Sequence, residues 1–322
     1  MEVNPFSMKV YNELVVYGWK NLSTDDGPGV RFALYLKGCS LRCPWCLNPY
    51  LQRIQPEIKW KADTCVLDSR CLEVCKCGAL QRSNGSFMVD YNLCNFCGMC
   101  WHSCESRSLR PVGEYIPVDR LVSLILRELS FQLPPKKATI GGGEPLLQGM
   151  ATLNLMRCLK NEGVNVYLAS CGGIVSRELW QGALEVADGI LLQILTIDEA
   201  EWQEFGGTNF DSYLRNIYDL KVYNKPVCVR IPIIPGYTDT PQKAYSLFRF
   251  VKENISDLEE VELRAYVPNS RFSSPMFKVK EKNLSTEQIV AVCEAIKGLG
   301  IEKVHWRGPV RGIEEIDLYP WR

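Results

Sequence analysis

GCSLRCPWCLNP, residues 38–49, is the stretch that decides how this 322-residue chain is interpreted. It places Cys39, Cys43 and Cys46 in a C-x3-C-x2-C pattern on one loop, directly after the apolar run VRFALYLKG at 30–38. Three thiolates on one loop can bind three irons of a four-iron cubane and leave the fourth iron open to a substrate or cofactor. The pattern therefore predicts a catalytic iron–sulfur cluster at the end of a strand.

The cysteine distribution around this loop also favours metal binding. Fifteen cysteines stand against two histidines, and eleven of the cysteines fall between Cys39 and Cys104, too local for a disulfide scaffold. A three-cysteine zinc site is the alternative for the first loop, with only His102 and His305 available as nitrogen ligands. Four cysteines lie in apolar surroundings and are expected to be ordinary buried thiols: Cys158, Cys171, Cys228 and Cys293.

A ferredoxin-type run follows further along the chain. LCNFCGMCWHSC has the bacterial ferredoxin spacing C-x2-C-x2-C-x3-C, formed by Cys94, Cys97, Cys100 and Cys104. Four cysteines this close are too crowded for paired zinc knuckles, so the run predicts a second iron–sulfur cluster. In two-cluster ferredoxins the fourth cysteine of each run binds the other cluster, so Cys104 and Cys75 could be exchanged.

The preceding segment TCVLDSRCLEVCKCGAL has the same spacing if an aspartate takes the second position. The run is then Cys65, Asp68, Cys71 and Cys75. Carboxylate is a harder and weaker donor to iron than thiolate, so we expect this cluster to be more labile. Two alternatives remain open: Cys77 could displace Asp68 as the fourth ligand, or Asp68 could be exposed beside a three-iron cluster.

Beyond the cysteine-rich third, short β-rich runs alternate with helical stretches such as 244–255 and 286–299. The β-rich runs are 30–38, 138–143, 164–170, 188–194, 226–234 and 260–267. They predict about six parallel strands in a complete or partial (β/α) barrel, with a doubly wound open sheet as the alternative. In either fold, ligands are expected at the carboxyl ends of the strands.

The periodic pattern disappears between residues 56 and 112. We expect an inserted small domain at 56–112, while 1–55 and 113–322 form the barrel. The insertion has too few apolar residues to build a core alone, so bound metal is expected to supply its folding free energy.

Composition excludes several classes of partner. Thirty-seven Lys and Arg balance thirty-seven Asp and Glu, so no net field exists to hold nucleic acid or an acidic membrane surface. The first twenty residues lack the apolar run of a signal peptide, and nowhere do eighteen apolar residues follow one another. We expect a cytoplasmic protein without nucleic-acid or membrane partners.

Several segments, taken in order, resemble radical S-adenosylmethionine (SAM) enzymes. The resemblance is closest to glycyl-radical-enzyme activating enzymes of the pyruvate formate-lyase activating type that carry a two-cluster ferredoxin insertion. The segments are STDDGPGVR (23–31), KGCSLRCPWCLNP (37–49), both ferredoxin-type runs, GGGEPLLQ (141–148) and RIPIIPGYTD (230–239). The resemblance implies an α/β fold, a partial (β/α)6 barrel of the radical SAM type with an inserted ferredoxin-like domain.

An activity and its cofactors follow from the same resemblance. It implies an oxidoreductase with S-adenosyl-L-methionine and three 4Fe-4S clusters, one catalytic and two auxiliary. The catalytic cluster of that family binds the amino and carboxylate groups of SAM, passes it an electron and releases a 5′-deoxyadenosyl radical. That radical takes a hydrogen from one glycine of a partner glycyl radical enzyme. A flavodoxin or ferredoxin-type protein is the implied electron donor.

Residue roles are also implied. In that family the segment that meets the methionine amino end matches Gly142, Gly143 and Glu144, with a tight turn as the alternative. Trp45, beside Cys46 and Leu47, matches the aromatic residue next to the adenine, unless it only packs. Asp26 matches the position that meets the partner's glycine-bearing loop, although DGPG is also ordinary turn chemistry.

The chain departs from the family at three cofactor contacts. In the fourth-strand motif Leu195 stands where a lysine meets the methionine carboxylate, while backbone contacts from Gln193 to Leu195 remain available. Val267 replaces a histidine after the sixth strand, and Ala169 replaces an aspartate of the third. Each lost contact costs about 1–3 kcal/mol. We therefore expect weaker SAM binding unless a nearby cation compensates, the candidates being Arg230 and Arg264.

Two other functions remain open at this point. One is a radical SAM enzyme that acts on another peptide or on a small molecule. The other is a non-catalytic iron–sulfur relative that serves as an electron relay or a partner-binding module.

Overall fold

The computed structural model describes residues 12–46, 48–83, 86–266, 291–292, 299–301 and 304–307. Its main feature is one sheet, whose strands are β1 (Glu13–Ser23), β2 (Arg31–Leu36), β7 (Glu114–Pro117), β8 (Lys137–Gly142), β9 (Asn165–Ser170), β10 (Gly189–Gln193), β11 (Val227–Ile233), β12 (Leu258–Ala265) and β13 (Val304–Arg307). The strand order is β13-β12-β11-β10-β9-β8-β2-β1-β7. Strands β2 and β8 to β13 run parallel, whereas β1 and β7 are antiparallel additions at one edge.

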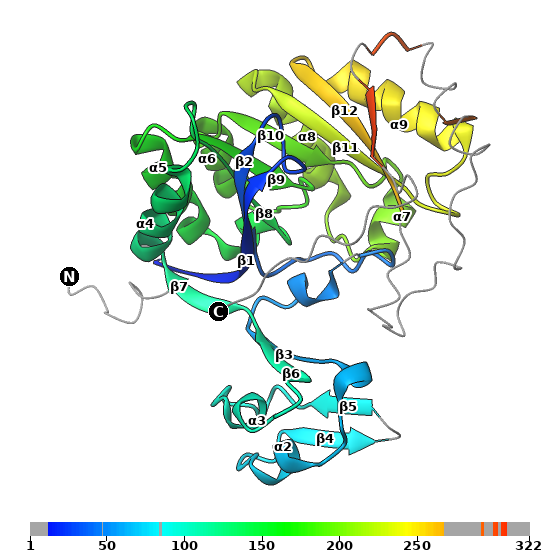
Figure 1. Cartoon of the computed structure of the whole chain (residues 1–322). Helices are drawn as coiled ribbons and strands as arrows, with labels where there is room; N and C mark the ends of the chain where they lie inside the picture. Colours follow the sequence, from blue (N-terminus) through cyan, green and yellow to red (C-terminus); the bar gives the residue numbers. More distant parts are fainter. Residues whose placement is uncertain are drawn as a thin grey trace, which may run out of the picture.

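Helices between the parallel strands cover the outer face of this sheet (Figure 1). They are α4 (Val118–Leu129), α5 (Met150–Asn161), α6 (Arg177–Val186), α7 (Glu199–Glu204), α8 (Phe210–Tyr223) and α9 (Pro241–Asn254). Four of them begin at side chains that accept a hydrogen bond from the first turn, namely Ser176, Asp198, Asn209 and Thr240. Within the described ranges, none of the helices has both the length and the apolar content needed to cross a membrane.

The α/β fold with a parallel sheet, predicted from the sequence, is confirmed. All six predicted strands are present, and the helix predicted at 244–255 is α9. The face of the parallel strands that packs under the helices is apolar, as the burial of Leu34, Ile140 and Leu168 shows. The helix predicted at 286–299 falls mostly outside the described residues, as do Leu47, Val267 and Cys293.

The cysteine-rich segment forms a separate small body below the sheet (Figure 1). Its elements are β3 (Glu57–Trp60), η2 (Ala62–Thr64), α2 (Arg70–Glu73), β4 (Leu80–Ser83), β5 (Ser86–Val89), α3 (Met99–His102) and β6 (Leu109–Val112). Strand β3 pairs with β6, and β4 pairs with β5, each antiparallel. The apolar cluster of this segment, which contains Ile58, Leu80 and Leu109, is distinct from the large core of the sheet.

A buried ion pair joins this segment to the sheet. Lys37, immediately after β2, is fully buried and donates to Glu57 of β3 (Nζ–Oε2 2.7 Å). Burial lowers the pKa of Lys37, and the neighbouring Glu57 carboxylate opposes that shift. Gly113, the residue after β6, packs directly against Lys37: a Cβ at this position would lie 2.3 Å from the Lys37 side chain. The end of β2 and both ends of the inserted segment therefore meet at one place.

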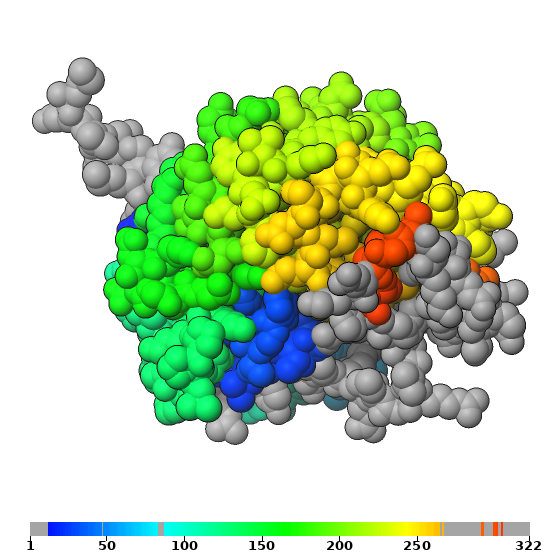
Figure 2. Space-filling model, turned by 90° about the horizontal axis from the view of Figure 1, so that it is seen from above, coloured from blue at the N-terminus to red at the C-terminus, as the bar shows by residue number. Residues whose placement is uncertain are grey.

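The turn between β1 and β2 reaches across the open sheet to its other side. The carbonyl oxygen of Asp25 accepts hydrogen bonds from Arg230 of β11 and from Arg264 of β12 (Nη2–O 2.8 Å for Arg264). Figure 2 shows this N-terminal segment, in blue, next to the gold of β12. Glu262 lies between the two arginines and pairs with both. These contacts hold the two sides of the curved sheet together.

Candidate functional site

A cavity of about 560 Å³ lies at the carboxyl ends of the parallel strands. Strands β8 to β12 contribute their last residues or those just beyond, among them Gly142 and Gly143, Ser170 and Cys171, Gln193 and Leu195, Ile234, and Tyr266. This is the edge at which ligands bind in folds of this class.

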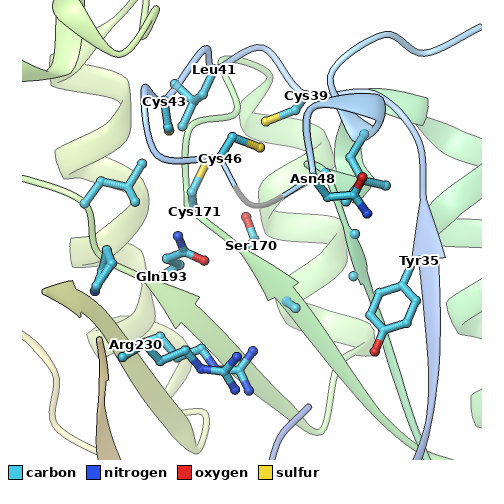
Figure 3. Close-up of a pocket in the computed structure, with 18 of the residues that line it drawn as sticks. Tyr35, Cys39, Leu41, Cys43, Cys46, Asn48, Ser170, Cys171, Gln193 and Arg230 are labelled. Carbon is cyan, nitrogen blue, oxygen red and sulfur yellow. The ribbon is translucent and has the colours of Figure 1, made fainter. Parts of the chain in front are cut away.

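The first cysteine loop forms one wall of this cavity. Cys39, Cys43 and Cys46 all line it, and Figure 3 shows their side chains on the loop above the strand ends. Backbone hydrogen bonds fix the loop at both ends: Gly38 N donates to Leu51 O (2.8 Å) and Cys46 N to Cys43 O (3.1 Å).

Arg42 holds the middle of the same loop. Its amide donates to Phe205 O (2.6 Å), and its guanidinium donates to the carbonyls of Cys39 (2.7 Å) and Leu41 (2.8 Å). The loop that carries the three thiols is therefore held by hydrogen bonds within itself and by one to Phe205, which directly follows α7.

The donor set fits an iron–sulfur cluster better than a single metal ion. Among the described residues, no group of three or more Cys, His, Asp or Glu side chains is arranged to bind a single metal ion. In a cubane each thiolate binds a different iron, so three thiols spread along a cavity wall fit that group. Burial raises the pKa of all three thiols, that of Cys39 to about 12 with a further contribution from Glu144. A bound iron ion would stabilise the thiolate forms of these three thiols.

The predicted methionine-binding segment lies beneath this loop. Gly142 and Gly143 line the cavity, and a Cβ at Gly143 would lie 2.1 Å from Gly38 O. Glu144 is fully buried; its Oε2 accepts hydrogen bonds from Ser170 Oγ (2.8 Å) and from Cys171 N (3.0 Å). Its Oε1 has no hydrogen-bond partner among the described residues. Burial raises the pKa of this carboxyl group, and those hydrogen bonds oppose the rise.

Trp45 both lines the cavity and packs in the core. Its ring lines the cavity but is only 5% exposed, because it packs against Phe205 (centroids 4.5 Å apart) and Tyr237 (4.9 Å). An edge of the indole therefore faces the cavity while most of the ring belongs to the core.

The other predicted contacts lie on the far walls. Gln193 and Leu195 both line the cavity, and Leu195 brings no charge to it. Arg230 and Arg264 line it as well, and Figure 3 shows Arg230 across from the cysteine loop. Both guanidiniums are already paired with Glu262, with Nε–Oε2 3.0 Å for Arg264.

Asp26 also lines the cavity, from the β1–β2 turn. Its carboxylate accepts hydrogen bonds from Ser23 Oγ (2.5 Å) and from Tyr35 OH (2.7 Å). Burial raises the pKa of Tyr35, and the Asp26 carboxylate raises it further, so the phenol remains the donor.

The cysteines of the two ferredoxin-type runs are not grouped in space as they are in the sequence. Cys65, Asp68 and Cys71 line a small second cavity together with Cys104 of the other run. Cys75 and Cys77 do not line this cavity; their sulfurs lie against each other, 3.7 Å apart. The structure thus favours the exchange of fourth cysteines over sequence-order pairing, and it places Cys77 away from Asp68.

Sequence reasoning missed Cys171 as a site residue. Expected to be an ordinary buried thiol, it lines the main cavity with the three loop cysteines (Figure 3). A signal was available, because Cys171 directly follows β9, and residues after a parallel strand face the ligand edge.

Comparison with known proteins shows which family the chain resembles. The profile of the radical SAM superfamily matches residues 90–248, and that of a 4Fe-4S single cluster domain matches residues 25–76. The isethionate sulfite-lyase activating enzyme of Nitratidesulfovibrio vulgaris is 30% identical over 247 residues, which are 74% of this chain and 80% of that protein. The choline trimethylamine-lyase activating enzyme of Oleidesulfovibrio alaskensis is 28% identical over 263 residues, 80% of this chain and 84% of that protein.

Among solved structures, SuiB of Streptococcus suis bound to S-adenosylmethionine has a TM-score of 0.50 at 13% identity. The match covers 65% of this chain and 46% of that chain. At this identity the likeness concerns the fold alone.

Proposed function

Since the chain belongs to the radical SAM family of activating enzymes for glycyl radical enzymes, we propose that it generates a glycyl radical on a partner enzyme at the cavity lined by Cys39, Cys43 and Cys46. The observation that carries this proposal is the meeting of three thiols with the ends of β8 to β12 around one cavity. When bound there, the cluster and SAM supply one-electron chemistry: an electron splits SAM into methionine and a 5′-deoxyadenosyl radical, which takes a hydrogen atom from the partner's glycine.

The chain's own residues bind and orient these groups. Cys39, Cys43 and Cys46 would hold the cluster, with SAM bound beside it in the same cavity. Gly142 and Gly143 let the amino and carboxylate groups of SAM approach the backbone closely. The unpartnered Oε1 of Glu144 offers a negative oxygen below them, where an ammonium group is favoured.

Other residues of the cavity position the rest of SAM and exclude water. Trp45 and Cys46, which line the cavity, form the proposed adenine side. Leu47 belongs to the same proposed set and lies outside the described residues. Gln193 and Leu195 contribute mainly through their backbone and through packing. Val267 belongs to the same proposed set. Asp26, held by Ser23 and Tyr35, faces the entering glycine-bearing loop.

We further propose three 4Fe-4S clusters: one on the first loop and two in the segment 57–112. The two runs of that segment supply Cys65, Asp68, Cys71, Cys75, Cys94, Cys97, Cys100 and Cys104, two ligand sets of four. The partner is a glycyl radical enzyme, and a flavodoxin or ferredoxin-type protein supplies the electron. The two relatives named above are activating enzymes of different lyases, so this family membership does not define the reaction that the partner enzyme catalyses.

The decisive experiment mixes the reduced, iron-loaded protein with SAM and a candidate glycyl radical enzyme, without oxygen. Electron paramagnetic resonance should show a glycine-centred doublet, and deoxyadenosine should form in step with it. Deoxyadenosine without the doublet would indicate another substrate. No deoxyadenosine at millimolar SAM would overturn the proposal and favour an electron relay.

A further inference from the structure

The segment 57–112 consists of two halves that repeat each other at a constant sequence offset. Strand β3 (57–60) corresponds to β5 (86–89), and β4 (80–83) corresponds to β6 (109–112). The same offset pairs Cys65 with Cys94, Asp68 with Cys97, Cys71 with Cys100, and Cys75 with Cys104. Asp68 is therefore the one member of the first run that is not cysteine.

The backbone around Asp68 has the shape of the backbone around Cys97. Leu67 and Ser69, on either side of Asp68, both have φ of 62°. Phe96 and Gly98, on either side of Cys97, have φ of 55° and 88°. Such values are rare for residues other than glycine, so their recurrence at matching positions is a specific feature. Asp68 therefore lies on the same kind of turn as Cys97, the corresponding cysteine of the second half.

The two halves exchange their last strands. Strand β6, which follows Cys104, pairs with β3 of the first half, and β4, which follows Cys75, pairs with β5 of the second. Each ladder is extended by one equivalent hydrogen bond. Lys61 N, just after β3, donates to Ser108 O, and Asp90 N, just after β5, donates to Ala79 O, both at 2.8 Å. Each fourth cysteine is therefore delivered to the other half.

The side chains follow this exchange. Cys65, Asp68, Cys71 and Cys104 line one cavity. Arg70 pairs with Asp68 (Nε–Oδ2 3.6 Å) and with Glu105, the residue after Cys104. Burial raises the pKa of Cys71, and the charges of Cys104, Cys65 and Asp68 raise it further, which places those groups around it.

The second group is its counterpart. Burial raises the pKa of Cys100 to about 11, and Cys94 and Cys75 contribute to that rise. Cys77 corresponds by position to Ser106, whose hydroxyl contacts Cys104 Sγ at 3.4 Å. Cys77 contacts Cys75 Sγ in the same way, at 3.7 Å. This pattern makes Cys77 a neighbour of the fourth ligand and not a ligand.

We propose that Cys65, Cys71, Cys104 and Asp68 bind one iron–sulfur cluster, and that Asp68 holds the single iron that exchanges. This inference rests on the proposed presence of clusters in this segment. The Asp68 side chain is 37% exposed, and both its oxygens face Arg70, so one oxygen can turn to iron while Arg70 stays on Glu105. A carboxylate binds iron more weakly than thiolate does, so this corner opens first.

The exchange is a defined redox step. A 4Fe-4S cluster of charge +2 loses one Fe²⁺ and gives one electron to an added oxidant, ferricyanide, which leaves a 3Fe-4S cluster of charge +1. Three thiolates, from Cys65, Cys71 and Cys104, remain to hold it. Added Fe²⁺ and a reductant reverse the step.

The test uses the full chain, loaded with iron, in which Cys39, Cys43 and Cys46 are all replaced by alanine. That background removes the first-loop cluster, which would also lose an iron on oxidation. Stoichiometric ferricyanide should release one iron per chain and give the resonance signal of a 3Fe-4S cluster. Asp68→Cys should release that iron at least about tenfold more slowly. Asp63→Asn, an exposed acid outside the cavity, is the matched control and should behave as the background does.

The exchange of ligands is tested separately in the same background. Cys104→Ser should abolish the 3Fe-4S signal, whereas Cys75→Ser should leave it. The opposite result would show that the runs bind in sequence order. If either serine variant fails to fold, Asp68→Cys still decides: iron release at the background rate would overturn the proposal. No arm depends on SAM cleavage, so failure here is distinct from failure of the proposed function.

Discussion

Cys171 is bonded twice to Glu144, since its amide and its thiol both donate to Oε2, at 3.0 and 3.3 Å. These bonds fasten the end of β9 to the segment that follows β8, directly beneath the cysteine loop. They satisfy one oxygen of a fully buried carboxylate and leave the other oriented without a partner among the described residues.

Glu144→Gln should weaken SAM binding without loss of iron. Glutamine keeps an acceptor for Ser170 and Cys171 but removes the negative charge proposed to meet the SAM ammonium. A hydrogen bond to a charged group contributes about 1.5–3 kcal/mol, so the Kd should rise about 10- to 150-fold. Equilibrium binding to the reduced, iron-loaded protein measures it. Glu162→Gln, an exposed acid, is the control; an unchanged Kd for Glu144→Gln would refute the role.

Replacement of Cys39, Cys43 or Cys46 by serine should remove the first-loop cluster alone. The iron content should fall by about four per chain, and the signals of the other two clusters should remain. Deoxyadenosine formation should be lost in each variant. Iron analysis and product chromatography measure both outcomes. Full activity in any one variant would contradict the assignment.

Gly143→Ala should displace the cysteine loop. The added methyl group would lie 2.1 Å from Gly38 O and 2.9 Å from Leu51 O, both backbone atoms that cannot rotate away. Such overpacking costs about 1–3 kcal/mol of unfolding free energy, and first-loop iron should be lost faster to a chelator. Gly163→Ala has strained backbone but open space around the new methyl. It should be destabilised without faster iron loss.

Glu262→Gln should destabilise the closure of the sheet, because it leaves Arg230 and Arg264 without their carboxylate. Removing one partner of a buried ion pair costs about 3–5 kcal/mol. Urea unfolding of the iron-free chain measures this loss. Glu253→Gln breaks an exposed pair with Arg249 and should cost less than about 1 kcal/mol.

The Glu262 contribution should depend on pH. Burial alone would raise the pKa of Glu262, but the two guanidiniums outweigh it and the net pKa is lowered. With a lowered native pKa, the unfolded chain takes up the proton first as pH falls. The wild-type advantage over Glu262→Gln should be constant above about pH 5 and shrink below about pH 4. An advantage that grows on acidification would contradict the pairing.

Six of the described parallel strands could be predicted because the runs that contain them are rich in apolar and β-branched residues. The short parallel strand β13, with the sequence VHWR, was not predicted. Strand β1 was not predicted, because its apolar residues are followed by polar ones near Asn21. The sequence also contains no pattern that distinguishes an antiparallel edge strand. The cysteine loop was evident from spacing alone. The partition of the ferredoxin-type runs was not, because it depends on which strands pair. The bonds from Arg230 and Arg264 to Asp25 join residues more than two hundred positions apart, beyond any local signal.

The pairing of β3 with β6 makes the cluster-bearing segment a closed excursion of the chain. Glu57 and Val112 are partners in that ladder, so the chain leaves the sheet and returns to it within about 5 Å. A short turn could bridge the same gap. The segment can therefore be inserted or deleted as one unit during evolution without a change in the strand order of the barrel. It could also be inserted into another protein at a position where two chain ends lie next to each other.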